Sequence, residues 1–344
     1  YPNLKAVPIP IALALFNAET GEQYTLQSET LFENTVKDGM YLFDQNEATI
    51  EFSGITAKPV VSLLRNFSAP VNLDFNYSDE ELAFLIQFET NGFNQWQATQ
   101  TLLERILLQG HDANIYVQAI KNTLPDLVEK DPLLASRLFD VPTEGYLGSR
   151  IDSDYSPIVI QEQRDALIYT LARALGSFCQ ETYLSLDPDL QKEFSQAMGV
   201  RALKNIMLNM MARQGDIAAF ELAFEQYKNT GNMSERLGAL KVLVWNDSPQ
   251  ASDALADFYN RFKDEALSLD QWFMVQAAHP KATVESIHYL TSHPDYDLTT
   301  PNRIRAVSGG LNTHPVNTWS FGVDHFIDLA KYLDEKNPIV GSRL

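Results

Sequence analysis

Cysteine is nearly missing from this sequence, since Cys179 is the only one in 344 residues. A single cysteine cannot form an internal disulfide, which excludes a disulfide-stabilised secreted scaffold and leads us to expect a cytoplasmic protein. No apolar run approaches the ~20 residues of a membrane-spanning helix. Basic residues are also few: 26 Lys and Arg stand against 45 Asp and Glu, for a net charge of -19. Without a basic cluster, nucleic acid and anionic membranes are poor partners.

The common catalytic and metal-binding motifs are absent as well. No H-E-x-x-H, G-x-S-x-G, Walker A or G-x-G-x-x-G sequence occurs. No two histidines have the i, i+4 spacing of a helical zinc site; they are His111, His279, His288, His293, His314 and His325. Cys179 lies in an apolar helical run and is typical of a small core residue. We therefore predict no catalytic residue, no metal ligand and no bound zinc within this chain.

Residues 1–77 have the pattern of β structure. Ile9, Ile11, Leu13 and Leu15 alternate with smaller residues, as in a strand with one buried face. Further strands are expected around residues 24–26, 40–43 and 48–52 and, most clearly, 71–77. Several short antiparallel strands separated by turn signals predict a small β-sandwich, which we expect to be incomplete at its N-terminal end.

Residues 78–344 have the pattern of successive amphipathic helices. Ser78 and Glu81 can form a capping box, which marks the first helix start. Short connections between the later helices favour antiparallel pairs stacked as an α-solenoid, and residues 140–156 alone have the composition of a longer loop. The predicted fold class is α+β, mainly α, with a small antiparallel sandwich over 1–77 and a large helical domain over 78–344. We expect the helical domain to be truncated at its C-terminal end.

The sequence Thr300-Pro301-Asn302-Arg303-Ile304-Arg305 is a helix start with two arginines in its first turns. Thr300 is suited to the N-cap, and Pro301 to the first helical position, where its missing N–H costs nothing. Arg303 and Arg305 are two residues apart, so they point in different directions. Whichever faces inward needs a carboxylate, carbonyls or a ligand. A structural ion pair and a substrate-facing arginine are both open interpretations of Arg305.

Several stretches, in their order along the chain, resemble the C-terminal half of bacterial aminopeptidase N, a zinc metalloaminopeptidase family. They are SDEELAFLIQFETNGFNQWQATQTLL, GNMSERLGALKVL, LDQWFMVQA, TPNRIRA and NPIVGSRL. Their joint order is specific, although each one alone is weak. The resemblance implies a longer parent protein in which 1–77 is most of a β-sandwich and 78–344 most of a helical cap. The parent's zinc, its ligands and its general-base glutamate would lie outside these residues.

In that family, the helical domain caps the zinc domain, and arginines line a cavity that leads to the metal. The matching positions are Arg305 in TPNRIRA and Arg343 in GSRL, with Ile339 one turn before Arg343. A guanidinium suits a peptide carboxylate or carbonyl. The resemblance thus implies a peptide substrate, substrate-cavity residues Arg305, Arg343 and Ile339, and an intramolecular contact with the missing catalytic domain. The alternative is a free-standing α-solenoid scaffold that binds a protein partner without catalysis.

Overall fold

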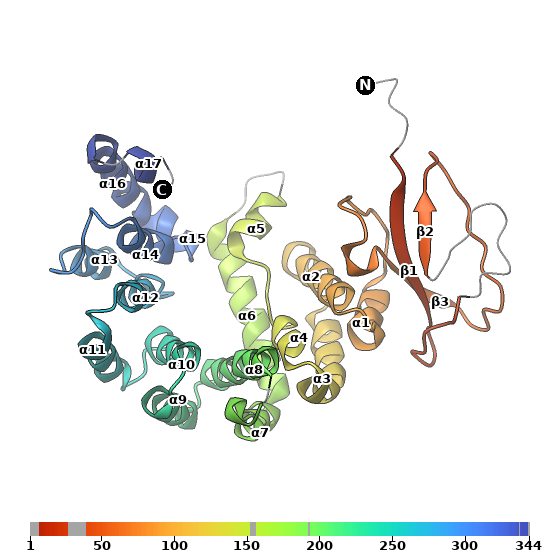
Figure 1. The fold of residues 1–344 in the computed structure, drawn as a ribbon, viewed down its shortest axis with the longest axis horizontal. Helices are drawn as coiled ribbons and strands as arrows, with labels where there is room; N and C mark the ends of the chain where they lie inside the picture. Colours follow the sequence, from red (N-terminus) through yellow and green to blue (C-terminus); the bar gives the residue numbers. More distant parts are fainter. Residues whose placement is uncertain (1–6, 27–38, 152–155, 192, 337, 343–344) are drawn as a thin grey trace. The chain divides into compact units, whose positions relative to one another are not determined.

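The computed structural model describes residues 7–26, 39–151, 156–191, 193–336 and 338–342. The chain divides into two compact units, Tyr1–Pro142 and Thr143–Leu344. In the described ranges the first contains the sheet, the short 3-10 helix η2 (Arg65–Phe67) and four α-helices, and the second contains the helices that follow (Figure 1). The domain division predicted from the sequence, between residues 77 and 78, differs from the boundary between these units and stays a prediction.

The first unit begins with a three-stranded antiparallel sheet of order β2-β1-β3. Its strands are β1 (Ile9–Asn17), β2 (Met40–Phe43) and β3 (Pro59–Leu63). The central strand pairs Ile11 with Tyr41 on one side and Leu15 with Val61 on the other. Leu13 of β1 and Tyr41 of β2 form a buried cluster within the sheet. The predicted strands around residues 9–15 and 40–43 are therefore confirmed.

Two other predicted strands, over residues 48–52 and 71–77, join no ladder in the described ranges. The chain does return beside β1 before residues 24–26, through an antiparallel bridge between Phe16 and Gln23 and a bond from Tyr24 N to Leu15 O, but no longer strand is described there. In the segment 71–77 the backbone–backbone hydrogen bonds are local, from Val71 N to Ala69 O and from Tyr77 N to Phe75 O, and the Tyr77 carbonyl accepts from the Arg105 side chain at 2.8 Å. Alternating residues favour an extended backbone, but a strand also needs a neighbour whose N–H and C=O groups are free to pair.

Four helices complete the first unit: α1 (Asp79–Phe88), α2 (Gly92–Gln109), α3 (Ala113–Lys130) and α4 (Pro132–Arg137). The capping box is confirmed, because the Ser78 side chain accepts from Glu81 N while Glu81 accepts from Ser78 N. The rings of Phe16 and Phe84 lie 6.3 Å apart. Arg65 also donates to the buried Glu89 carboxylate at 2.7 Å. These contacts join the sheet to the first helices.

The second unit is helical. Its elements are α5 (Glu144–Ser149), α6 (Pro157–Leu175), α7 (Ser177–Ser185), η3 (Pro188–Leu190), α8 (Phe194–Arg213), α9 (Ile217–Asn229), α10 (Met233–Trp245), α11 (Ala251–Phe262), α12 (Ala266–Ala277), α13 (Val284–Thr291), α14 (Pro301–Leu311), α15 (Pro315–Asn317), η4 (Thr318–Gly322), α16 (Val323–Lys336) and α17 (Pro338–Gly341). The loop predicted over 140–156 contains α5. Thr143 caps this helix, and Arg164 pairs with its buried first residue, Glu144, at 2.8 Å.

Alternate helices of the second unit form an inner row, in which α6, α8, α10, α12 and α14 each contact the next. The short helix α15 then contacts α6, so the row returns to its first member. The helices α7, α9, α11 and α13 lie on the outside of this row (Figure 1). The predicted fold class, α+β and mainly α with a small antiparallel sandwich before a large solenoid-like helical domain, is confirmed; in the described residues the β part is one three-stranded antiparallel sheet. None of the helices in the described ranges is both long and apolar enough to cross a membrane.

Candidate functional site

The candidate site begins at the N-terminal turns of α14. Thr300 occupies the N-cap position and Pro301 the first helical position, as the sequence predicts. The Thr300 hydroxyl does not cap the helix, however; it donates to the Asp297 carboxylate at 2.6 Å. The helix start is therefore fixed by proline and by the preceding turn, and it sets the directions of Arg303 and Arg305.

Arg303 is the inward arginine. Its Nε donates to Asp270 Oδ1 at 2.6 Å, and the two side chains are only 7% and 10% exposed. The guanidinium also donates to the Asp295 carbonyl and lies 5.0 Å from the ring centre of Phe273. A buried cation needs such partners, because desolvation of an unpaired charge is costly. The structural ion pair that the sequence left open belongs to Arg303.

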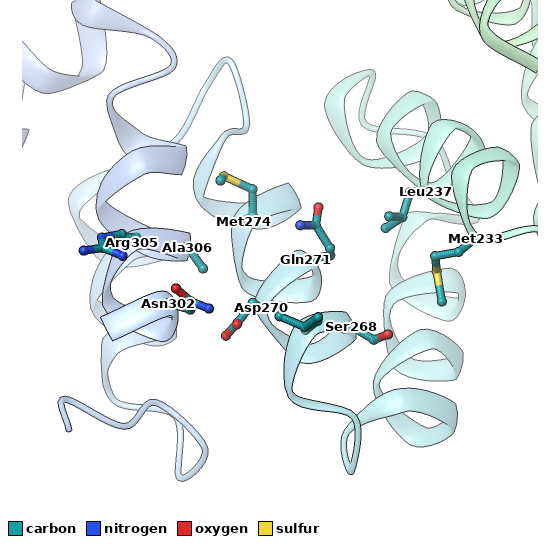
Figure 2. Close-up of a pocket in the computed structure, with 10 residues that line it drawn as sticks. Met233, Leu237, Ser268, Asp270, Gln271, Met274, Asn302, Arg305 and Ala306 are labelled. Atoms are coloured by element: carbon teal, nitrogen blue, oxygen red, sulfur yellow. The ribbon is translucent and has the colours of Figure 1, made fainter. Parts of the chain in front are cut away.

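Arg305 has the opposite environment. Its side chain is exposed, and it lines a cavity of about 560 Å³ between α10, α12 and α14. The lining residues are Met233, Leu237, Leu267, Ser268, Asp270, Gln271, Met274, Asn302, Arg305 and Ala306. We call this cavity the α10–α14 groove. Figure 2 shows Arg305 and Asn302 on one wall, Gln271 and Met274 on the middle helix, and Leu237 and Met233 on the opposite wall.

Within the described ranges, Arg305 is the one cationic side chain that lines the α10–α14 groove. Among the described residues, Arg305 has no hydrogen-bond or ion-pair partner. Asp270 is the one lining carboxylate, and Arg303 neutralises it from behind. The other polar side chains of the groove are uncharged, and no lining residue is a histidine or a cysteine. The groove therefore places the guanidinium of Arg305 beside apolar surface, an arrangement suited to an anion.

Of the other two predicted cavity residues only Ile339 is described, and it does not line this groove. Ile339 lies on α17 and is 67% exposed, whereas its neighbour Val340 is buried. Val340 packs in a cluster with Ile304, Leu329 and Leu333, so this contact directs α17. Arg343 lies outside the described residues. The prediction that Arg305, Arg343 and Ile339 share one substrate cavity stays a prediction.

The remaining groove residues were not predicted from the sequence. Gln271 and Met274 lie in the quoted stretch LDQWFMVQA, and Met233 and Leu237 in GNMSERLGALKVL, but neither stretch indicates which residues face α14. No group of three His, Cys, Asp or Glu side chains in the described ranges is arranged to hold a metal ion. The described residues therefore do not fit a zinc centre, and we assign no step to zinc here.

Comparison with known proteins extends over almost the whole chain. Residues 2–76 match the family described as a domain of unknown function (DUF3458) with an Ig-like fold. Residues 79–344 match its companion, a domain of unknown function (DUF3458_C) with ARM repeats. The ARM-repeat description agrees with the helical array of the second unit.

Individual relatives are bacterial aminopeptidases. The chain is 29% identical to aminopeptidase N of Escherichia coli over 98% of this chain and 40% of that protein. It is 27% identical to aminopeptidase N of Haemophilus influenzae, over 98% of this chain and 39% of that protein. A crystal structure of Legionella pneumophila aminopeptidase A in complex with aspartic acid superposes with a TM-score of 0.82 at 25% identity, covering 99% of this chain and 41% of that one.

The chain spans about two fifths of the length of these relatives. The resemblance to bacterial aminopeptidase N that rests on five short stretches is thus confirmed over nearly every residue. The match to the ARM-repeat family alone, over residues 79–344, covers more than half of the chain. This protein therefore belongs to the family that joins a DUF3458 Ig-like domain to a DUF3458_C ARM-repeat domain.

Proposed function

We propose that these 344 residues are the sandwich and helical cap of a longer zinc-dependent aminopeptidase, which releases N-terminal residues from peptides. The zinc, its ligands and the catalytic base belong to the remainder of that parent protein, which contacts this chain and lies in the cytoplasm. The helical domain encloses the peptide's path, and Arg305, Arg343 and Ile339 face it. The chain alone has no peptidase activity and binds neither zinc nor nucleic acid.

The observation that carries this proposal is the match of nearly the whole chain to two fifths of aminopeptidases N. The contrast on α14 supports the role of Arg305. Its neighbour Arg303 stabilises the helix packing, whereas Arg305 lines the α10–α14 groove without a partner among the described residues. An arginine that no protein group satisfies is suited to a ligand carboxylate or carbonyl. The Legionella relative holds aspartic acid, a free amino acid of the kind that an aminopeptidase releases.

The gene upstream of Tyr1 tests the assignment. It should encode an H-E-x-x-H sequence followed by a downstream glutamate, which is the ligand pattern of the proposed zinc domain. The expressed full-length parent should release N-terminal residues from peptides, and a chelator should abolish this activity. A start codon immediately before Tyr1 would instead favour a free-standing scaffold.

Metal analysis tests whether the zinc is bound by the remainder of the parent protein and not by this chain. The purified 344-residue chain should contain no stoichiometric zinc and hydrolyse no peptide, whereas the full-length parent should contain one tightly held zinc per active site. One tightly bound zinc in the 344-residue chain would contradict the proposal.

A further inference from the structure

The inner row of helices returns to α6 through a very short element. The chain runs from α14 into α15, a helix of three residues, which meets α5 and the first turns of α6 (Figure 1). We call the contact of α15 with α5 and α6 the closing seam. Three titratable side chains of the described residues meet there: Glu144 of α5, Arg164 of α6, and His314, which directly precedes α15.

Several polar atoms in the closing seam are buried without a partner. Arg164 donates to Glu144 Oε1 at 2.8 Å, whereas His314 Nδ1 lies 3.9 Å from the same oxygen, which is too far for a hydrogen bond. Glu144 Oε2 and both ring nitrogens of His314 are buried, and no group in the described ranges satisfies them. The closed seam therefore carries the desolvation cost of three polar atoms without the hydrogen bonds that would offset it.

Each of the other junctions in the inner row is held by a direct polar contact. These contacts are Arg213 with Asp165 between α8 and α6 at 3.3 Å, Asn205 with the Ser234 carbonyl between α8 and α10 at 3.2 Å, Trp245 with the Val275 carbonyl between α10 and α12 at 2.9 Å, and Arg303 with Asp270 between α14 and α12 at 2.6 Å. His314 makes no such contact across the closing seam with any described residue. The closing seam is in this respect unlike the rest of the row.

The two sides of the closing seam are attached to different parts of the second unit. On one side, Asn317 of α15 donates to the carbonyls of His279 and Pro280, both at 3.3 Å, in the connection between α12 and α13. On the other side, Glu144 is attached to Arg164 of α6. The apolar residues of α15, Pro315 and Val316, are only half-buried. Separation of the two sides therefore exposes little apolar surface and leaves both attachments in place.

We propose that the inner row of helices opens at the closing seam. In the open state α15 stays with the connection between α12 and α13, and Glu144 stays with Arg164. Water then hydrates Glu144 Oε2 and the His314 ring, which removes the cost that these atoms carry in the closed state. This inference goes beyond the proposed function, because it assigns a conformational change to the helical array itself. It needs neither a catalytic domain nor a substrate.

Hydrogen exchange of the 344-residue chain tests the opening, because amides that the seam protects exchange when it separates. His314→Leu removes two unpartnered polar atoms from the seam, and it removes no helix cap, since the His314 side chain caps nothing. Amides of α5, on the opposite side of the seam, should then exchange about tenfold more slowly. His314→Asn is the matched variant: its amide again buries polar atoms, so exchange in α5 should stay within about twofold of the unaltered chain.

A second control lies outside the seam. His288→Leu alters an exposed histidine on α13 and should leave exchange in α5 unchanged. Unchanged exchange in α5 of His314→Leu, or equal slowing in His314→Asn or His288→Leu, would overturn the inference. A lower melting temperature or loss of folding in His314→Leu would also overturn it, because removal of unpartnered buried atoms should not destabilise the closed seam. The aminopeptidase assignment does not depend on any of these outcomes.

Discussion

Arg303 and Arg305 lie two residues apart on α14, yet one is part of the interior and the other is available to a ligand. Arg303 is held by the Asp270 carboxylate, the Asp295 carbonyl and the face of Phe273. Arg305 lines the α10–α14 groove and has no such partner among the described residues. The comparison teaches that the same residue type in the same helical turn can serve stability or binding, depending on which neighbour its side chain faces.

The same contrast recurs further along the helix at Gly309 and Gly310. A Cβ at Gly310 would lie 2.8 Å from Ala277 Cβ on α12, whereas a Cβ at Gly309 would meet only Met274 Cε at 3.9 Å. One side of α14 is therefore in close contact with α12, and the adjacent positions have space. The Arg303–Asp270 ion pair joins the same two helices, α14 and α12.

The largest expected effect is that of Arg303→Ala. It leaves the buried Asp270 carboxylate without its cation, which should lower the free energy of unfolding by about 3–5 kcal/mol. Urea denaturation of the 344-residue chain measures this change. The double variant Arg303→Met with Asp270→Leu should recover most of the loss, because it removes both charges. A decrease of less than about 1 kcal/mol in the unfolding free energy of Arg303→Ala would show that the ion pair does not stabilise the packing of α14 against α12.

Gly310→Ala should have the next largest effect. The added methyl group overlaps Ala277, so α12 and α14 must separate, at a cost of about 1–3 kcal/mol in unfolding free energy. Gly309→Ala is the matched control, and it should stabilise the helix by about 0.5–1 kcal/mol because alanine is the better helix former. Equal effects of the two substitutions in thermal melts would contradict the close approach of the two helices.

Arg305→Ala should alter binding in the full-length parent. For a peptide with a free carboxylate, KM should rise about tenfold with kcat unchanged, since the contact is equal in the ground and transition states. For a short amide substrate that lacks the carboxylate, KM should not change. Arg173→Ala serves as the control and should leave both substrates unaffected. An equal rise of KM for the two substrates would show that Arg305 does not contact the peptide carboxylate.

The smallest expected effect is that of Arg305→Ala on stability. Because its guanidinium holds no partner among the described residues, the unfolding free energy of the 344-residue chain should change by less than about 0.5 kcal/mol. Measured beside Arg303→Ala, this experiment gives the sharpest form of the comparison. A decrease in unfolding free energy similar to that of Arg303→Ala would mean that Arg305 also stabilises the helix packing.

Local signals in the sequence were sufficient for most of the helical architecture. Ser78 with Glu81, and Thr300 with Pro301, predicted two helix starts at the positions that the structure has. The first succeeds because a capping side chain acts within a few residues of the backbone groups it satisfies, and the second because proline is favoured at the first helical position even though the Thr300 hydroxyl does not cap α14. The strand predicted over residues 71–77 did not form in the described structure, because strand formation depends on a neighbour that is distant in sequence. The alternation of residues predicts an extended backbone but does not supply that neighbour.

The sequence by itself determined that α14 starts at Pro301 and that its two arginines point in different directions. Only the tertiary structure decided which of them faces Asp270 on α12 and which lines the groove with Met233 and Leu237 of α10. These groups come from helices far apart along the chain. Helical spacing determines the angle between two side chains on one helix, whereas the packing of neighbouring helices determines what each side chain meets.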